Sequence, residues 1–229
     1  MSIFRTETLP CPLCAEPVEF EVCQSVNADR RPDLRTAIIE RRFQRETCAV
    51  CDTEFRRPPD MTYMNIGRKQ WIIAAPAPVV AEWGAMEKQA RATFDRSYGP
   101  TASPMAQEMA VGLAVRVVFG WAAFREKLVA AEAGLDDATL ELLKLSVIRN
   151  DADLLDEKSE LRLIDATPDT LTLARVVTVT DALEELLTVP RAAYDAIAAA
   201  PAVWADLKAE LTAGPFVDLH RLLVAPQPA

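Results

Sequence analysis

The chain contains a single histidine, His220, and only seven glycines in 229 residues. One imidazole cannot build a His-based zinc hydrolase site, and no Ser-His-Asp triad can be assembled around it from the sequence. The glycines are scattered, and none of them forms a phosphate-binding loop or a dinucleotide-binding pattern. We interpret His220 as an ordinary core or surface histidine. These absences favour a protein that is not an enzyme, and we predict no catalytic residue and no site for an organic cofactor.

Long apolar runs are also missing. The most membrane-like stretch, residues 109–124, is interrupted by Arg116 and is shorter than the roughly 20 residues that a spanning helix needs. We expect a buried or interface helix there, as a candidate for self-association, and no membrane partner. Residues 1–10 have no apolar core of the kind found in signal peptides, so the expected location is the cytoplasm.

Positive charge is scarce in the second part of the chain. The formal net charge is −9, and residues 1–70 carry equal numbers of acidic and basic side chains, so the excess acid lies in residues 71–229. An acidic protein is a poor general binder of nucleic-acid phosphates, although a local basic patch can still act.

Four of the five cysteines form two Cys-x-x-Cys pairs, Cys11/Cys14 and Cys48/Cys51. In a reducing compartment such pairs are more often metal ligands or redox groups than disulfides. Two short knuckles can close a tetrahedral zinc site, and an all-cysteine site leaves no open position for catalysis. We therefore predict one structural Zn²⁺ on these four residues. The 33 residues between the pairs indicate a folded insertion.

A redox role is the alternative for the first pair, because Cys11-Pro12-Leu13-Cys14 has the form of a glutaredoxin-type dithiol. Such a site needs its first cysteine at a helix start, where the helix dipole lowers the thiol pKa. Pro17 and an alternating strand pattern after it argue against that helix. Cys23, the odd thiol, is interpreted as a small residue covered by the inserted helix, without a function.

Basic residues gather around the second pair and keep open a nucleic-acid-binding alternative: Arg41, Arg42, Arg45, Arg56, Arg57, Arg68 and Lys69. The aromatic residues between them are Phe43, Phe55, Tyr63 and Trp71. Glu46, Asp52, Glu54 and Asp60 lie in the same stretch. Because a nucleic-acid site needs a patch of one sign, we favour strands that alternate between solvent and core.

A further enzyme alternative is a hydrolase that uses clustered carboxylates. Its candidate residues are Asp151, Asp153, Asp156 and Glu157. We interpret this cluster as a solvated loop after a helix, since charge runs in such places are usually solvated.

The pattern predicts an α+β fold in two parts. Residues 1–78 would form a small zinc-ribbon-like β module, with strands on either side of an inserted helix that starts at Pro32. The run Ala75-Pro76-Ala77-Pro78 marks the expected boundary, because it cannot continue a central strand or helix. Residues 79–229 would form a helix-rich α+β region.

Within that second region, the periodicity predicts helices over residues 79–98, 103–134 and 136–148. Residues 161–165 and 170–177 alternate on either side of Thr167-Pro168-Asp169, as the strands of a hairpin do. Shorter helices are expected around residues 181–187, 191–199 and 202–211, and a last strand over residues 216–224.

Residues 9–78 resemble the CpXC domain, a prokaryotic family named for its Cys-Pro-x-Cys motif. The matching segments are Cys11-Pro12-Leu13-Cys14, Ser25-Val26-Asn27, Pro32-Asp33-Leu34-Arg35, Ile38-Ile39, Cys48-Ala49-Val50-Cys51, Tyr63 and Trp71-Ile72-Ile73-Ala74-Ala75-Pro76. The resemblance implies a zinc-ribbon-like module that extends to about residue 130, because the family domain is longer than the first part. It implies very little about activity, since the family is largely uncharacterised.

Knuckles of this type usually carry glycine after the second cysteine, where φ is positive. This chain has Ala15 and Asp52 at those positions, so we expect backbone strain at Ala15 above all. Together these features predict a binding or assembly protein with a protein partner or a second copy of itself. A nucleic-acid-binding zinc ribbon remains the alternative, and a thiol oxidoreductase is less favoured.

Overall fold

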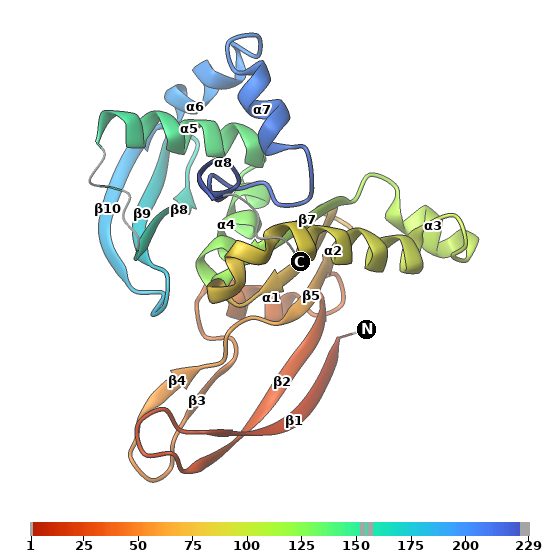
Figure 1. Ribbon diagram of the computed structural model, residues 1–229, viewed down its shortest axis with the longest axis vertical. Coiled ribbons are helices and arrows are strands. Elements are labelled where there is room, and N and C mark those ends of the chain that lie inside the picture. Colours follow the sequence, from red (N-terminus) through yellow and green to blue (C-terminus); the bar gives the residue numbers. More distant parts are fainter. Residues whose placement is uncertain (1, 152–153, 155–157, 225–229) are drawn as a thin grey trace.

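The computed structural model describes residues 2–151, 154 and 158–224, and it has the predicted α+β architecture (Figure 1). The first part of the chain contains β1 (Ile3–Pro10), β2 (Pro17–Asn27), α1 (Pro32–Ile39), β3 (Arg45–Thr47), β4 (Glu54–Arg56), β5 (Met61–Asn65) and β6 (Gln70–Ala75). The inserted helix at Pro32 and the strands on either side of it agree with the prediction, and β1 is an additional strand. That strand lies at a sheet edge and is largely exposed, so it has little of the apolar alternation that would reveal it.

A five-stranded mixed sheet forms the centre of the molecule, in the order β1-β2-β5-β6-β7. Strands β1 and β2 are antiparallel, as are β5 and β6. Strand β2 runs parallel to β5, with Val26 opposite Tyr63, and β6 runs parallel to β7 (Ala114–Phe119). The sheet therefore continues past Pro76 and Pro78, the segment at which the sequence predicts a boundary.

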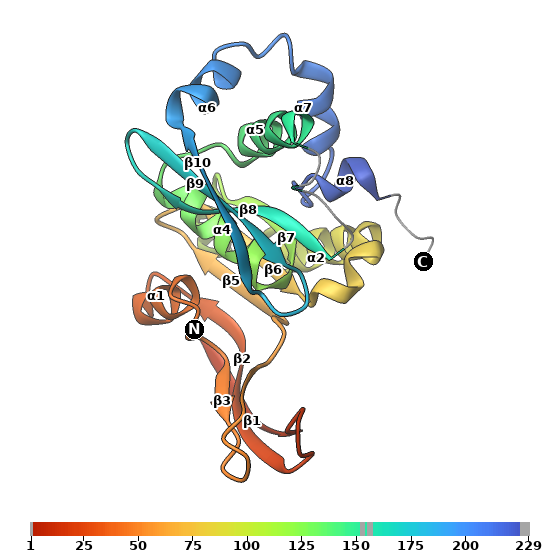
Figure 2. The same cartoon turned by 90° about the vertical axis from the view of Figure 1, so that its left-hand side faces the viewer.

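Helices cover both faces of this sheet (Figure 2). On one face, Tyr63 and Ile72 pack with Leu34 of α1 and with Phe124 of α4 (Gly120–Glu132). On the other face, Trp71 packs beneath α2 (Trp83–Tyr98), which follows the short 3₁₀ helix η1 (Ala77–Glu82). Adjacent residues of β6 thus face opposite layers, as the pleat of a strand requires.

The single helix predicted over residues 103–134 is wrong. That segment forms α3 (Pro104–Ala110), β7 and α4. Gly112 and Gly120 have φ of +76° and +83°, values that interrupt a right-handed helix on either side of the β-branched run in β7. Val117 and Phe119 are buried in this chain's own core. The second half of the apolar stretch 109–124 is therefore buried, as one of the two expected alternatives required, but the stretch forms the end of α3, β7 and the start of α4 and not one helix.

The last part of the chain forms a second, three-stranded sheet in the order β10-β9-β8. Helix α5 (Asp137–Asn150) begins after its N-cap Asp136, as predicted, and β8 (Ser159–Ala166) with β9 (Thr170–Val177) forms the predicted hairpin. Helices α6 (Arg191–Ala198) and α7 (Ala205–Leu211) also agree with the prediction.

Two predictions in this region are wrong. Residues 181–187 belong mostly to β10 (Leu183–Pro190), which pairs with β9. Residues 216–224 contain α8 (His220–Leu223) instead of a strand. Strand β10 was missed because it is mostly exposed and shows little apolar alternation, while β9 offers it an edge for pairing. Nothing in the local pattern of residues 216–224 distinguishes the short helix from a strand. None of the helices in the described residues is long and apolar enough to span a membrane.

Candidate metal centre

Two β-hairpins carry the four paired cysteines away from the rest of the molecule (Figures 1 and 2). The hairpin of β1 and β2 has Cys11 and Cys14 in its turn, and the hairpin of β3 and β4 has Cys48 and Cys51. Phe20 and Phe55 join the hairpins, with ring centroids 5.2 Å apart. We call this pair of hairpins the arm.

The two knuckles have the same backbone geometry. The Cys11 N–H donates to Glu16 O at 2.8 Å, and the Ala15 N–H donates to Cys11 O at 2.9 Å. In the second knuckle, the Cys48 N–H donates to Thr53 O at 3.0 Å, and the Asp52 N–H donates to Cys48 O at 2.9 Å. The residue after each second cysteine has a positive φ, 60° at Ala15 and 55° at Asp52, as predicted.

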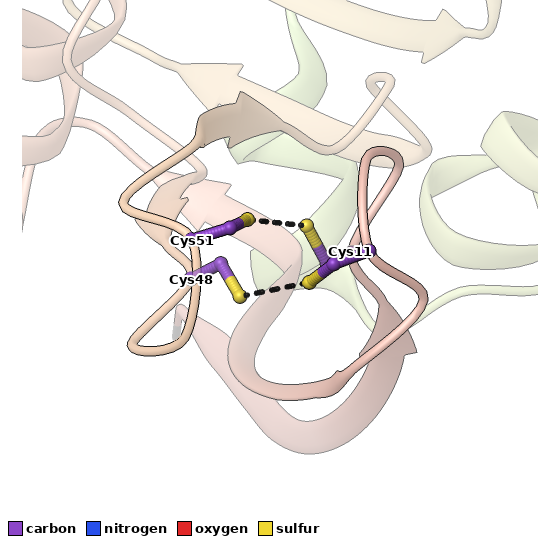
Figure 3. Close-up of side chains that lie close together, drawn as sticks. Cys11, Cys48 and Cys51 are labelled. Carbon is purple, nitrogen blue, oxygen red and sulfur yellow. Dashed lines mark hydrogen bonds between the residues drawn. The ribbon is translucent and has the colours of Figure 1, made fainter.

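The four sulfur atoms of the knuckles converge (Figure 3). Cys11 Sγ lies 3.6 Å from Cys51 Sγ, and Cys14 Sγ lies 3.6 Å from Cys48 Sγ. All four ligand atoms lie within 4.8 Å of one another. Each knuckle thus faces the other with both of its sulfurs, and the four residues could hold a metal ion.

Hydrogen bonding within this cluster gives Cys14 and Cys51 different pKa values. Hydrogen bonds from the hydroxyl and backbone of Thr53 lower the pKa of Cys51 to about 6. A backbone hydrogen bond at Glu16 lowers the pKa of Cys14, but hydrogen bonding with Cys51 and the other thiols raises it more, to about 12. Four thiolates at such distances repel one another, so full deprotonation needs a cation at their centre.

The fifth cysteine is separate from the cluster. Cys23 is fully buried in β2, among the core residues that include Leu34 and Ile38 of α1. Its thiol donates to Ser25 O at 3.3 Å, and burial raises its pKa to about 11. This confirms a small core residue beneath the inserted helix.

The redox alternative lacks the helix that it requires. Strand β2 begins at Pro17, three residues after Cys14, so no helix dipole acts on Cys11 or Cys14.

The arginines of the nucleic-acid alternative are paired with carboxylates. Arg41 and Arg56 lie near Asp181, Arg42 near Glu40, Arg45 near Glu54, Arg57 near Glu7 and Asp60, and Arg68 near Glu132. Of the interleaved aromatic residues, Phe43, Tyr63 and Trp71 are buried in the core. The arrangement does not provide a surface of one sign with exposed rings for base stacking.

The structure also reveals a buried ionic network that the sequence analysis missed. Glu126 accepts from Lys144 Nζ at 2.9 Å and from Arg162 Nη1 at 3.0 Å. Lys144 also contacts Glu141 at 2.8 Å, and Arg162 pairs with Asp218. Oxygens of Glu126, Glu141 and Asp218 come close enough to hold a metal, but Lys144 and Arg162 already supply positive charge to them. The sequence signal was a charged run at residues 125–127 inside an otherwise apolar segment.

Of the remaining candidates, the structure describes His220 and Asp151. His220 Nδ1 lies 2.8 Å from Asp218 Oδ1, which is the satisfied histidine that we expected. Of the acidic cluster, Asp153, Asp156 and Glu157 lie outside the described residues, and Asp151 forms the C-cap of α5.

Comparison with known proteins assigns the family. No curated protein and no solved structure matches the chain. The sequence model described as CpXC protein matches residues 9–144, which include both knuckles, the strands β2, β5, β6 and β7 of the central sheet and the first part of α5. With more than half of its length matched, this chain belongs to the CpXC family.

Proposed function

We propose that the four cysteines bind one structural Zn²⁺. Zinc–sulfur bonds are about 2.3 Å long, and a tetrahedron of that size places sulfurs about 3.8 Å apart. The observed separations of 3.6 Å between facing sulfurs fit that arrangement. Cys11, Cys14, Cys48 and Cys51 would fill every coordination position. The ion would then fix the two hairpins to each other and take no part in catalysis.

Elemental analysis of the purified protein tests the metal. We expect one zinc per chain, and loss of most of it in Cys48→Ser. Cys23→Ser is the matched control, because it removes a buried thiol outside the cluster and should keep the zinc. Folded protein that contains no zinc after purification without chelator, and takes none up, would contradict the proposal.

We further infer that the protein is a binding module that presents the tip of the arm to a protein partner. The observation that carries this inference is the exposure of Leu13 and Val50, which leave 71% and 67% of their surface in solvent. Both occupy the position before the second cysteine of a knuckle, so the metal would hold the two apolar side chains in one rigid tip. Exposed apolar groups on a rigid element are typical of interaction sites.

A protein partner suits this tip better than a nucleic acid. Glu16 and Asp52 lie within two residues of the second cysteine of each knuckle, and a tetrathiolate zinc site carries a net negative formal charge. Negative charge at this place repels phosphate groups. A second copy of the chain is one form that such a partner could take.

Two double variants test the inference: Leu13→Ser/Val50→Ser changes the tip, and Val111→Ser/Val203→Ser is the control. Crosslinking in the native host measures the capture of a partner, and light scattering measures the mass of the purified protein. Val111 and Val203 are equally exposed, at 76% and 75%. We expect the tip variant to lose a partner, or a dimer, that the control variant keeps. Equal capture and equal mass for both variants and the wild type would contradict a role for the tip.

A further inference from the structure

An unusual concentration of arginines lies where the arm meets the rest of the chain. Three guanidinium groups surround one carboxylate, that of Asp181 in the turn before β10. Arg125 pairs with it through two hydrogen bonds of 2.6 and 2.7 Å, Arg56 lies at 3.0 Å and Arg41 at 3.6 Å. Three positive charges on one negative charge leave an excess of positive charge.

Two of the three arginines are buried, and the Arg41 side chain is 30% exposed. The Arg56 and Arg125 side chains are each 8% exposed, and the Arg56 guanidinium carbon lies 3.9 Å from the centre of the Trp121 ring. Within the described part of the chain, Arg41 Nε and Arg56 Nη2 have no hydrogen-bond partner. Burial, together with the neighbouring charge of Arg125, lowers the pKa of Arg56 to about 9 despite the presence of Asp181. A buried cation without full compensation costs stability unless an anion joins it.

A cavity of about 210 Å³ opens beside this cluster, between α4 and the three-stranded sheet. Its polar walls are Arg41, Arg125 and Arg162. No described residue with a carboxylate group lines it. Arg162 is 97% buried, and its Nε has no hydrogen-bond partner among the described residues.

The rest of the cavity wall is apolar. Ala122 and Val129 line it on the α4 side, on the same face as Arg125 because they are three and four residues away from it. Val176 of β9 and Leu183 of β10 line it on the sheet side. A ligand here would therefore meet both positive charge and hydrocarbon.

We propose that this cavity binds a small aliphatic anion, with its charged group against Arg41 and Arg125 and its carbon chain against α4 and the second sheet. Arginine suits both carboxylate and phosphate groups, because its guanidinium donates charge-assisted hydrogen bonds to either. Arg41 Nε has no partner among the described residues and would donate to the anion. Both Nη atoms of Arg125 already donate to Asp181, so Arg125 would contribute its charge. A bound anion would balance the charge that Asp181 alone leaves uncompensated. The site is independent of the metal centre, because none of its residues is a cysteine of the knuckles.

Calorimetric titration of the full chain at low ionic strength tests the site with four probes: hexanoate, hexyl phosphate, hexanamide and acetate. We expect at least one of the two six-carbon anions to bind at least about tenfold more tightly than hexanamide, which lacks the charge, and than acetate, which lacks the chain. The tighter of the two anions identifies the headgroup. If neither binds, or if hexanamide binds as tightly, the proposal is overturned; equal binding of acetate overturns the role of the apolar wall.

Variants localise the binding. Arg41→Gln removes one charge from the cavity and should weaken the anion at least about tenfold, in line with the loss of a charge-assisted hydrogen bond. Arg31→Gln is the matched control, since Arg31 is an exposed arginine of the same insertion and pairs with Asp33. The affinity of this variant for the anion should equal that of the wild type. Ala122→Leu fills the cavity without altering charge and should abolish binding. Circular dichroism checks that each variant is folded, and unchanged affinity in a folded Ala122→Leu protein would place the anion elsewhere and overturn the proposal.

Discussion

Ala15 and Asp52 occupy equivalent left-handed positions after the two knuckles, but the backbone conformation does not cost them the same. Asparagine and aspartate tolerate positive φ better than other residues, because their short polar side chains can hydrogen-bond locally. Alanine has no such compensation. The φ of 60° at Ala15 is therefore a strained conformation, and the strain is held at one ligand loop of the candidate metal centre.

Replacing Ala15 with glycine should consequently stabilise the protein. Relief of the left-handed conformation is worth about 1–2 kcal/mol, and the greater flexibility of unfolded glycine takes back about 0.4–1 kcal/mol, so we expect a gain of roughly 0.5–1 kcal/mol. Denaturant unfolding of the zinc-loaded protein measures it. Ala49→Gly is the control, because Ala49 lies in the second knuckle without a positive φ, and it should not stabilise. A loss of stability in Ala15→Gly would show that the loop is not strained.

At the scale of elements, the junction of β7 and α4 determines how the apolar segment 109–124 is used. Gly120 lets the chain turn directly from strand into helix with φ of +83°, and a Cβ there would lie 3.1 Å from the Cβ of Ala77. Without this turn, α4 could not lie across the sheet face on which Phe124 and Leu128 are buried.

Gly120→Ala should destabilise the protein by about 2–3 kcal/mol, through backbone strain and the contact with Ala77 together. Gly134→Ala separates the two causes. Gly134 also has a positive φ, +66°, but a Cβ there meets nothing within 4 Å, so only the strain of about 1–2 kcal/mol should appear. Thermal and denaturant melts of both variants check this, and equal losses would rule out the contact with Ala77.

Within the arm, the hairpin of β3 and β4 depends on its contacts with the other hairpin and on a bound metal more than the strands of the central sheet do. Strands β3 and β4 have three residues each and pair only with one another, and a short isolated hairpin is at best marginally stable. Strands β5, β6 and β7 instead lie in the covered central sheet.

Removing a bound metal with a chelator should therefore loosen the hairpin of β3 and β4 and leave the covered central strands unchanged. Hydrogen exchange followed by mass spectrometry should show faster exchange in residues 44–57 and unchanged exchange in β5, β6 and β7. Readdition of zinc should restore the protection. If the central strands lose protection at the same chelator concentration, the metal supports the whole molecule and the arm is not an independent unit.

For the molecule as a whole, the buried ionic network ties the central sheet to the second one. Lys144 of α5 lies near Glu126 and Glu141, and Lys127 of α4 lies 3.5 Å from Glu141. Arg162 of β8 pairs with Glu126, Glu160 and Asp218. Four carboxylates thus share three cations at this point.

Burial is the main cause that raises the pKa of Glu141 to about 7. The negative charges of Glu126 and Asp218 also raise this pKa, while the positive charge of Lys144 lowers it by less than burial raises it. The pKa values of Glu126 and Asp218 are lowered against the cost of their burial, by Lys144 and Arg162 respectively.

Stability should consequently fall as pH rises from about 5 to 8. A raised pKa means that folded Glu141 keeps a proton that the unfolded chain, with a pKa near 4.5, releases. The contribution of Glu141 to the free energy of unfolding is therefore complete below about pH 4.5. It is lost as the pH rises through about 7. His220, whose pKa is raised by Asp218 against the cost of burial, acts in the same direction. The lowered pKa values of Glu126 and Asp218 affect stability only at more acidic pH.

Glu141→Gln should remove most of this dependence, because the neutral amide mimics the protonated acid. Urea unfolding at pH 5 and pH 8 should give a difference of roughly 1–3 kcal/mol in the wild type and a much smaller one in the variant. A wild-type free energy of unfolding that rises over this interval would contradict the assignment of a raised pKa to Glu141.

Local patterns were enough to predict the elements whose partners are close in sequence. The capped α5, the β8–β9 hairpin and the positive φ after both knuckles follow from side chains within a few residues. The failures have different causes. Strands β1 and β10 lie at sheet edges and are mostly exposed, so their sequences carry little apolar alternation. Strand β7 gains its conformation from β6, which lies far away in the chain. The buried Glu126 and Lys144 are tolerable only because the fold brings opposite charges together.

The sequence by itself determined the four cysteine ligand candidates, because the spacing within each Cys-x-x-Cys pair is set by one tight turn whose geometry is local. It also determined the family, through motifs that are read directly from residues. Only the tertiary structure decided that the arginines around Cys48 and Cys51 are paired, that Leu13 and Val50 share an exposed tip, and that three arginines line an apolar cavity. Those features depend on distances between residues up to about 140 positions apart, and such distances are fixed by packing of the whole core and not by any local pattern.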